Sequence, residues 1–491
     1  MRFYACVFLF ANVLSWSQIS ILAAEEETLF SFTPTQQVAL DFVDAQRDNI
    51  LEVNRAIWEF AEVGLEERQS ADLLMQKLKE HGFEIEAGIA NLPTAFVATY
   101  GAGRPVIGLL AEYDALPGLS QKVTPQREPV QEGAPGHACG HSGLGAGAFG
   151  AIIAVKEAME RQNLPGTIRL YGTPAEETVI GKVYMTLGGV FNDLDVCLHW
   201  HPSSKNRTFS RSSKALVSVK FTFAGVAAHA SGTPESGRSA LDAVELMNIG
   251  VNYMREHVKE DARLHYVITD GGAAPNVVPA QATVWYFIRA DEHTDVERNY
   301  QWVRDIAQGA ALMTQTKLTV RIETDCHEVV PNGPLADVLQ THLEAVGAPK
   351  FSDTEKLFAR RLQQPLVEQF GTEFPVPLDE SIHPLHQNLE PTKGSTDVGD
   401  ISWHVPTSGI NTTCLIAETP GHSWQDVAAI RSSIGEKGII YATKVLATAT
   451  IDLLERPEVV TAAKADFEER MRERAYTTLV PAGQMPPKKI R

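Results

Sequence analysis

Cysteine is scarce in this sequence, and basic residues are outnumbered by acidic ones. The 491 residues include five cysteines, which are too far apart for the closely spaced framework of a disulfide-stapled fold. Cys197, Cys326 and Cys414 are expected to pack as small apolar side chains. The 43 lysines and arginines against 61 acidic residues give a formal net charge of −18. That charge argues against nucleic acid or an anionic membrane surface as a partner.

Long apolar runs are also missing, except at the N-terminus. Arg2 is followed by an apolar stretch over 3–16, and small residues at 22–24 precede three glutamates. This pattern predicts a signal peptide over 1–24, cleaved after Ala24, and therefore a periplasmic or secreted protein. The alternative is an uncleaved anchor. No later run has the length of a membrane span.

Length and composition indicate a globular protein of two domains. Hydrophobic residues make up 44% and charged residues 21%, and 491 residues exceed one ordinary core. Apolar runs predict strands that alternate with helical segments, which is typical of a doubly wound α/β fold with a mixed sheet. The expected strands cover 105–112, 167–172, 195–200 and 410–417, and the expected helices cover 36–62, 69–82 and 143–162.

A segment with a different order of predicted strands and helices interrupts this alternation. Its expected order of strands and helices is βαββαβ, which predicts an inserted ferredoxin-like domain. The predicted organisation is a catalytic domain in two parts, a lid or dimerisation insert, and a charged C-terminal tail that covers the surface or frays. The predicted limits are 34–213 and 327–456 for the catalytic domain, 214–326 for the insert and 457–491 for the tail. A proline-rich stretch over 357–396 could form a lid.

Four short clusters of metal-binding side chains follow the predicted strands. Ligands in open α/β sheets bind at the carboxyl ends of the strands, so these clusters are expected to meet. Thiolate, imidazole and carboxylate groups suit two divalent ions and leave one carboxylate free to move protons in a hydrolysis. The clusters contain Cys139 and His141, Glu176 and Glu177, His201 with its neighbour His199, and His422.

Each cluster also has a plainer interpretation when taken alone. The glycines around Cys139 could form a phosphate loop, although no Gly-Lys-Ser/Thr sequence ends it. Paired glutamates in a loop are often solvated surface, and a lone loop histidine such as His422 is often structural. Asp114 is a candidate for orienting a ligand imidazole. The residues alone do not decide between His199 and His201.

Taken together, the motifs resemble one known family. They include Ala-Glu-Tyr-Asp-Ala-Leu-Pro-Gly, Gly-His-Ala-Cys-Gly-His, Pro-Ala-Glu-Glu, Trp-His-Pro, Ala-Ala-His-Ala, Pro-Asn-Val-Val-Pro and Ser-Thr-Asp-Val-Gly-Asp. They are similar to those of the dinuclear metallopeptidase family that contains aminoacylases, carboxypeptidase G and auxin-conjugate amidohydrolases. The likeness runs from about 46 to 454. It implies a two-metal catalytic domain with an inserted dimerisation domain.

The resemblance also implies roles for single residues. Glu176 matches the general base, and His201 is preferred over His199 because of its Trp-His-Pro context. His229 matches a histidine that reaches the partner subunit's site and steadies the oxyanion. Ser142 departs from the family, where Asp or Asn is usual. The positions that match metal ligands are Cys139, His141, Glu177, His201 and His422, and those that match substrate-carboxylate contacts are Asn276 and Arg289.

These matches imply a metal-dependent amidohydrolase. It would cleave the amide between an acyl or aroyl group and an amino acid, as in p-aminobenzoyl-glutamate, using zinc or manganese. The expected assembly is a homodimer, or a heteromer with a related subunit. Two alternatives remain open, an exported dipeptidase or aminoacylase and a non-catalytic binding subunit.

Overall fold

The structure, a computed structural model, describes residues 30–385 and 390–489. The predicted signal peptide over 1–24 lies outside these residues and stays a prediction, as does the location that depends on it. The account below concerns the compact unit that begins at Phe32. In the part of the chain that the structure describes, no helix is both long and apolar enough to cross a membrane.

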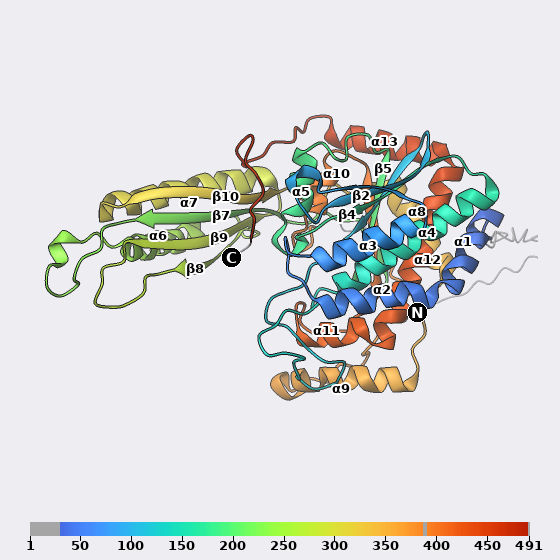
Figure 1. Ribbon diagram of the computed structural model, residues 1–491, viewed down its shortest axis with the longest axis horizontal. Coiled ribbons are helices and arrows are strands. Elements are labelled where there is room, and N and C mark those ends of the chain that lie inside the picture. The colour runs from blue at the N-terminus through green and yellow to red at the C-terminus, as the bar shows by residue number, and fades with distance from the viewer. Residues whose placement is uncertain (1–29, 386–389, 490–491) are drawn as a thin grey trace, which may run out of the picture. The chain divides into compact units, whose positions relative to one another are not determined.

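A seven-stranded mixed sheet forms the centre of the catalytic part (Figure 1). Its strand order is β1-β2-β4-β3-β5-β11-β6. The four central strands, β4, β3, β5 and β11, run parallel, while β1, β2 and β6 join the edges antiparallel. The strands are β1 (Glu84–Ala87), β2 (Phe96–Ala102), β3 (Val106–Ala111), β4 (Gly166–Gly172), β5 (Val196–Ser203), β6 (Arg207–Thr208) and β11 (Thr407–Thr413). The mixed sheet predicted from the sequence is thus confirmed.

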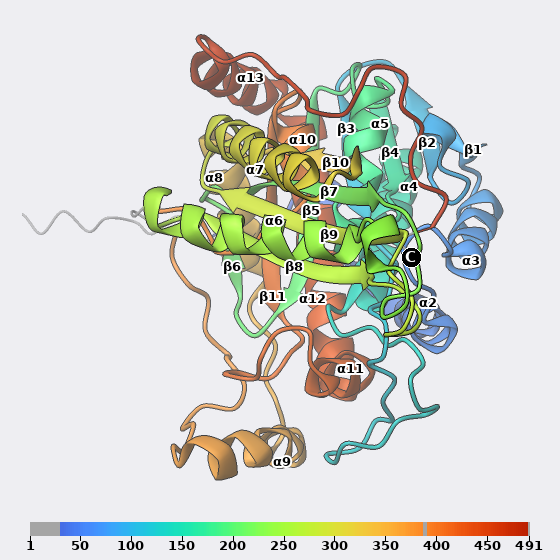
Figure 2. The ribbon, with the colours of Figure 1, turned by 90° about the vertical axis from the view of Figure 1, so that its left-hand side faces the viewer.

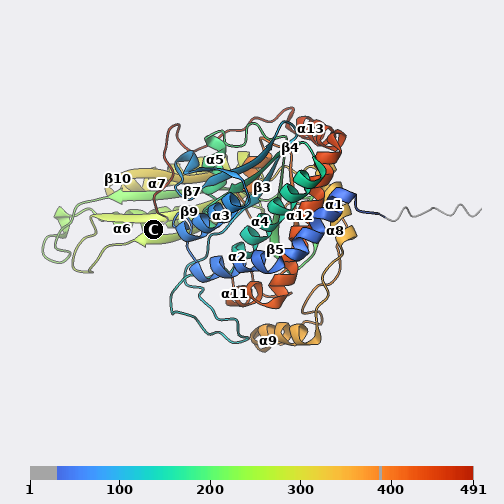
Figure 3. The same ribbon diagram turned by 45° about the vertical axis from the view of Figure 1, so that its right-hand side comes forward.

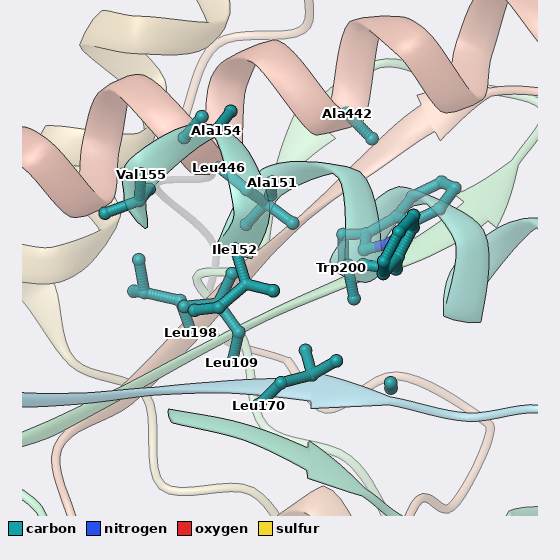
Figure 4. Packing of buried hydrophobic residues seen from close by; sticks show 14 of the residues in the cluster. Leu109, Ala151, Ile152, Ala154, Val155, Leu170, Leu198, Trp200, Ala442 and Leu446 are labelled. Carbon is teal, nitrogen blue, oxygen red and sulfur yellow. The ribbon is translucent and has the colours of Figure 1, made fainter. Parts of the chain in front are cut away.

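Helices cover this sheet, and α4 (His141–Gln162) is buried over most of its length. Figure 3 shows α4 beside α2 and α12. Small residues let α4 approach the strands closely, since a Cβ on Gly147 would lie 2.6 Å from the Trp200 indole. Ile152 packs beside side chains of β3, β4 and β5 in the core (Figure 4). The other helices are α1 (Pro34–Ala45), α2 (Arg47–Phe60), α3 (Arg68–Glu80), α5 (Gly181–Leu187), α8 (Gly333–Val346), α9 (Asp353–Phe370), α10 (Val398–Ser402), α11 (Trp424–Arg431), α12 (Ser433–Glu455) and α13 (Pro457–Met471).

The inserted segment has the predicted βαββαβ order. Its four antiparallel strands lie in the order β10-β7-β9-β8, which leaves β8 at an edge. Figure 2 shows α6 and α7 together on one face of this sheet. The ferredoxin-like prediction is confirmed, while the predicted domain limits stay predictions. The elements are β7 (Ala215–Ala224), α6 (Ala240–Met254), β8 (Arg263–Asp270), β9 (Gln281–Ala290), α7 (His293–Thr314) and β10 (Lys317–Cys326).

Several local expectations differ from the structure. The single helix expected over 36–62 is two helices that meet at Gln46. His201, expected just after the strand over 195–200, lies inside β5, which continues to Ser203. The first part of the proline-rich stretch over 357–396 belongs to the helix α9, which ends at Phe370. The tail contains α13 and then an extended segment, in which the Tyr476 hydroxyl donates to Asp400 at 2.7 Å.

Candidate metal centre and active site

The predicted clusters meet at the carboxyl ends of the central strands. Asp114 follows β3, the Glu176–Glu177 pair follows β4, and His201 lies near the end of β5. Cys139 and His141 stand at the start of α4, and His422 lies in the loop after β11. Three groups of possible metal ligands result, each with its ligand atoms within 4.8 Å of one another. They are Cys139, His141 and His201; Cys139, Glu177 and His422; and Glu112, His141 and Glu176.

His141 is completely buried and has a fixed orientation. Its Nδ1–H donates to Asp114 Oδ1 at 2.8 Å, which leaves Nε2 available as a ligand. Glu112 Oε2 lies 3.3 Å and Glu176 Oε2 lies 3.8 Å from Nε2. Asp114 therefore lies where the sequence placed it, behind the imidazole.

His201 lies closer to the proposed ligands than His199 does. Its Nε2 is 3.3 Å from Cys139 Sγ, and its Nδ1–H donates to the Pro202 carbonyl at 2.7 Å. His199 instead lies against Phe209, with tilted rings whose centroids are 4.8 Å apart, and belongs to none of the three groups. Of the two histidines, His201 is the one that lies in a group of possible ligands, and its role as a ligand stays a prediction.

The Glu176–Glu177 turn is held in an uncommon backbone conformation. Ala175 and Val179, on either side of it, have φ values of 56° and 50°, in a left-handed region that a β-branched residue rarely adopts. The Ala175 N–H donates to Glu67 Oε1 at 2.7 Å, and the Glu177 N–H donates to Asp114 Oδ2 at 2.9 Å. These carboxylates fix the turn so that both glutamates face the cluster.

His422 completes the second group from a loop. Its φ of 59° is also left-handed, and its Nε2 lies 3.5 Å from Glu177 Oε2. The side chain is 56% exposed. His422 is therefore the proposed ligand that solvent reaches most easily.

Three buried polar atoms without partners indicate that the donor set fits divalent cations. His141 Nε2, Glu112 Oε2 and Glu177 Oε1 are buried atoms with no hydrogen-bond partner among the described residues. Buried polar atoms are rarely left unpaired without a reason such as an ion. The first two ligand groups share Cys139, which would let two ions lie next to each other.

Burial dominates the protonation of the cluster. It raises the pKa of Glu176 well above its usual range, and the nearby Glu112 adds to this. It also raises the pKa of Glu177 to about 8 and that of Cys139 well above its usual range. Burial lowers the pKa of His201 to about 4, followed by the effect of His141. A cation bound here would favour the deprotonated carboxylates and thiolate.

A buried lysine next to the site was not predicted from the sequence. The Lys182 ammonium is fully buried, 2.8 Å from Glu112 Oε1 and 2.6 Å from Asp397 Oδ1. Burial raises the pKa of both carboxyls and Lys182 lowers it, with a balance at about 2 for Glu112 and about 6 for Asp397. Glu112 and Asp397 belong to motifs quoted above, but no sequence signal marks Lys182 as buried.

Glu67 was also missed. It is fully buried, accepts from Thr94 and from Ala175, and has a pKa raised to about 8 by burial and by Asp114. Its sequence neighbours are charged, a context typical of a surface residue. Ser142, the departure from the family pattern, is buried, and its hydroxyl has no partner among the described residues.

A cavity of 640 Å³ opens onto the cluster. Arg289 lines it, together with Phe287 and Leu216 from the insert. His229 and Asn276 are exposed neighbours on the insert, and neither lines this cavity. A single chain therefore does not test the roles predicted for His229 and Asn276, and these roles stay predictions.

Comparisons with known proteins agree with this fold and site. Residues 211–312 match a peptidase dimerisation domain. The chain is 40% identical to the B subunit of p-aminobenzoyl-glutamate hydrolase of Escherichia coli (strain K12), over 84% of this chain and 90% of that protein. It is 27% identical to mouse Xaa-Arg dipeptidase, over 89% and 92% of the two chains. A dinuclear metal-binding M20 peptidase of Bacillus subtilis has a similar fold, with a TM-score of 0.54 at 18% identity, over 84% of this chain and 99% of that one.

The fold, the donor set and these relatives define a hydrolase of amide bonds of the metallopeptidase class. The chain belongs to the M20 family of peptidases. The family resemblance drawn from the motifs is thereby confirmed.

Lys182 provides a stability test of the acid cluster. In Lys182→Met, Glu112 and Asp397 would be buried without a cation, so we expect the free energy of unfolding to fall by about 3–5 kcal/mol. Urea unfolding followed by circular dichroism measures this. The matched control is Lys444→Met, which removes a lysine paired with the exposed Asp44 and should cost about 0–1 kcal/mol. Equal effects of the two substitutions would contradict the importance of the buried pair.

Proposed function

We propose that this protein hydrolyses the amide bond of N-acyl or N-aroyl amino acids, such as p-aminobenzoyl-glutamate, with two divalent metal ions per chain. The observation that carries the proposal is the pair of ligand groups that share Cys139, next to the buried carboxylate of Glu176. A non-catalytic binding protein would not need this complete set. The relative with the highest identity given above, part of a p-aminobenzoyl-glutamate hydrolase, supports the substrate class.

Cys139, His141, Glu177, His201 and His422 would hold the ions. Divalent ions bound there supply Lewis acidity, which polarises the scissile carbonyl and lowers the pKa of water. The thiolate of Cys139 favours zinc, although the carboxylate and imidazole ligands also accept manganese. Asp114 keeps His141 in the tautomer that presents Nε2.

Glu176 is the proposed proton carrier. Its side chain is buried beside His141 Nε2 and has an elevated proton affinity. A carboxylate with these properties accepts a proton from water and then donates it to the leaving amine. Arg289 in the cavity wall would hold the free carboxylate of the substrate through paired hydrogen bonds.

His229 is proposed to act in the site of a partner subunit. Its Nδ1 accepts N–H bonds from Ser231 at 3.2 Å and Gly232 at 3.0 Å. The ring proton is therefore on Nε2 in the neutral form, where it can donate to a developing oxyanion. Asn276 lies next to His229 and would assist substrate binding from the same loops.

The insert offers a surface for such a dimer. Strand β8 lies at the sheet edge, and Val267 and Ile268 on it are exposed. Ile249 and Tyr253 on the neighbouring α6 are exposed as well. An apolar edge strand is a ready surface for pairing. We propose a homodimer through this face, with a related second chain in a heteromer as the alternative.

Export to the periplasm or medium is also part of the proposal. It is supported by the signal-like sequence over 1–24. Sequencing the N-terminus of the protein from its own cells should give a chain that begins at Glu25. Recovery of a chain that still begins at Met1 would contradict export with cleavage.

Glu176 and Glu177 should differ in the effect of the same substitution. Glu176→Gln should keep about two metal ions per chain but lose most turnover of N-benzoyl amino acids, because an amide cannot carry protons. Glu177→Gln should lower the metal content. Elemental analysis and hydrolysis rates, with and without a chelator, measure both properties. Near-normal rates in both variants, or chelator-resistant activity in wild-type protein free of metal, would refute the proposal.

The shared site can be tested by mixing two inactive variants. His229→Ala should lower kcat by about a hundredfold with metal content unchanged, the usual effect of losing one oxyanion donor. Mixed with Glu176→Gln, it should regain activity, because one site of a mixed dimer has its own Glu176 and the partner's His229. No recovery after verified subunit exchange would show that His229 does not act across the interface.

A further inference from the structure

Two arginines in the cavity have no function in the proposal above. Arg207 and Arg211 line the same cavity as Arg289 and the metal-ligand cluster. All three arginines are partly buried. In residues 30–385 and 390–489, none of them forms an ion pair with a carboxylate. Partly buried guanidinium groups are usually paired, so this arrangement calls for an anion from outside the chain.

The strand register places Arg207 two strands away from His201, one of the proposed metal ligands. His201 on β5 is paired with Asn411 on β11, which is paired with Arg207 on β6. Residues in register on adjacent strands point to the same face, and two strand spacings correspond to about 10 Å. The Asn411 amide donates to the His201 carbonyl at 3.0 Å and accepts from Arg207 Nε at 3.0 Å. Arg207 is therefore oriented, with its terminal N–H groups left for another acceptor.

Arg211 adds a second positive charge close to the first. Burial lowers the pKa of Arg207, and the charge of Arg211 lowers it further. Two like charges close enough to affect each other destabilise the free site, and an anion between them would relieve the repulsion. Ser395 also lines the cavity, and its hydroxyl is a buried group without a partner among the described residues.

We propose that Arg207 and Arg211 form a second carboxylate subsite, which selects substrates with one negative charge more than the carboxylate held by Arg289. Guanidinium groups bind carboxylates through paired, charge-assisted hydrogen bonds. The backbone of Arg207 lies two strand spacings, about 10 Å, from that of His201. An extra carboxylate bound by Arg207 would therefore belong either to the side chain of the amino acid or to the far end of the acyl group. The preferred substrate is thus a dianionic N-acyl amino acid. The inference rests on the proposed function for its choice of compounds.

Matched substrates test this subsite. The first pair compares N-benzoyl-glutamate with N-benzoyl-glutamine, which differ by a carboxylate on the amino acid. The second pair compares N-(4-carboxybenzoyl)-alanine with N-benzoyl-alanine, which differ by a carboxylate on the acyl group. We expect kcat/KM to favour the dianion at least tenfold in one of the two pairs, mainly through KM. The double variant Arg207→Gln/Arg211→Gln should reduce that ratio about tenfold or more, because two charged hydrogen-bond partners are lost.

Arg161→Gln is the control, since Arg161 pairs with Glu157 on the surface of α4 and should leave the ratio unchanged. Turnover of both members of each pair with ratios near one, or ratios that persist in the double variant, would overturn the subsite and leave the proposed function standing. Calorimetric binding to Glu176→Gln separates the opposite case. Charge-selective binding that depends on the two arginines, in a protein that hydrolyses none of the four compounds, would keep the subsite and refute the proposed reaction.

Discussion

The crowding of buried carboxyl groups at one end of the sheet is the constraint on which this site depends. Six acidic side chains are gathered there with little exposure to solvent, namely Glu67, Glu112, Asp114, Glu176, Glu177 and Asp397. Burial alone would leave most of them protonated. Lys182 is the fixed positive partner of Glu112 and Asp397, and the imidazole N–H of His141 donates to Asp114. The remaining excess of negative groups is what makes the cluster suited to divalent ions.

The same constraint explains how the turn after β4 keeps its strained backbone. Glu67 and Asp114 accept N–H groups on either side of the turn, and Thr324 on β10 donates to the Val179 carbonyl at 2.5 Å. The insert therefore contributes to the geometry of the glutamate pair. Such strain persists at functional sites because several surrounding contacts hold the same backbone conformation. A substitution in β10 can thus alter the site without touching a ligand.

The sequence predicted the clusters well because each one is local. Most of them are a buried strand followed within a few residues by His, Glu or Asp, whereas Cys139 and His141 form a short motif at the start of a helix. Such patterns are visible without knowledge of the fold, and parallel strands then bring the ends together. Lys182 could not be found this way, because its partners lie 70 residues before it and 215 residues after it in the chain. Arg207 depends on the register of β6 against β11, and a two-residue strand gives no periodic signal. The break at Gln46 was missed because both helices share one apolar pattern.

The net charge of the chain does not describe the wall of its cavity, which holds three arginines as well as four acidic residues. A formal charge of −18 repels anions at long range, but at physiological salt charges farther apart than about 8 Å are largely screened. Inside the cavity, the groups that would attract an anionic substrate are Arg207, Arg211 and Arg289, which lie in its wall. A dianionic substrate of the proposed kind would reach the metal-ligand cluster with its neutral amide, while its carboxylates would lie near the arginines. Acidic and basic groups at different places in one cavity wall would thus orient the substrate before any chemistry begins. They would do so through positions on β6, the loop that follows it and β9 that no global property of the sequence reveals.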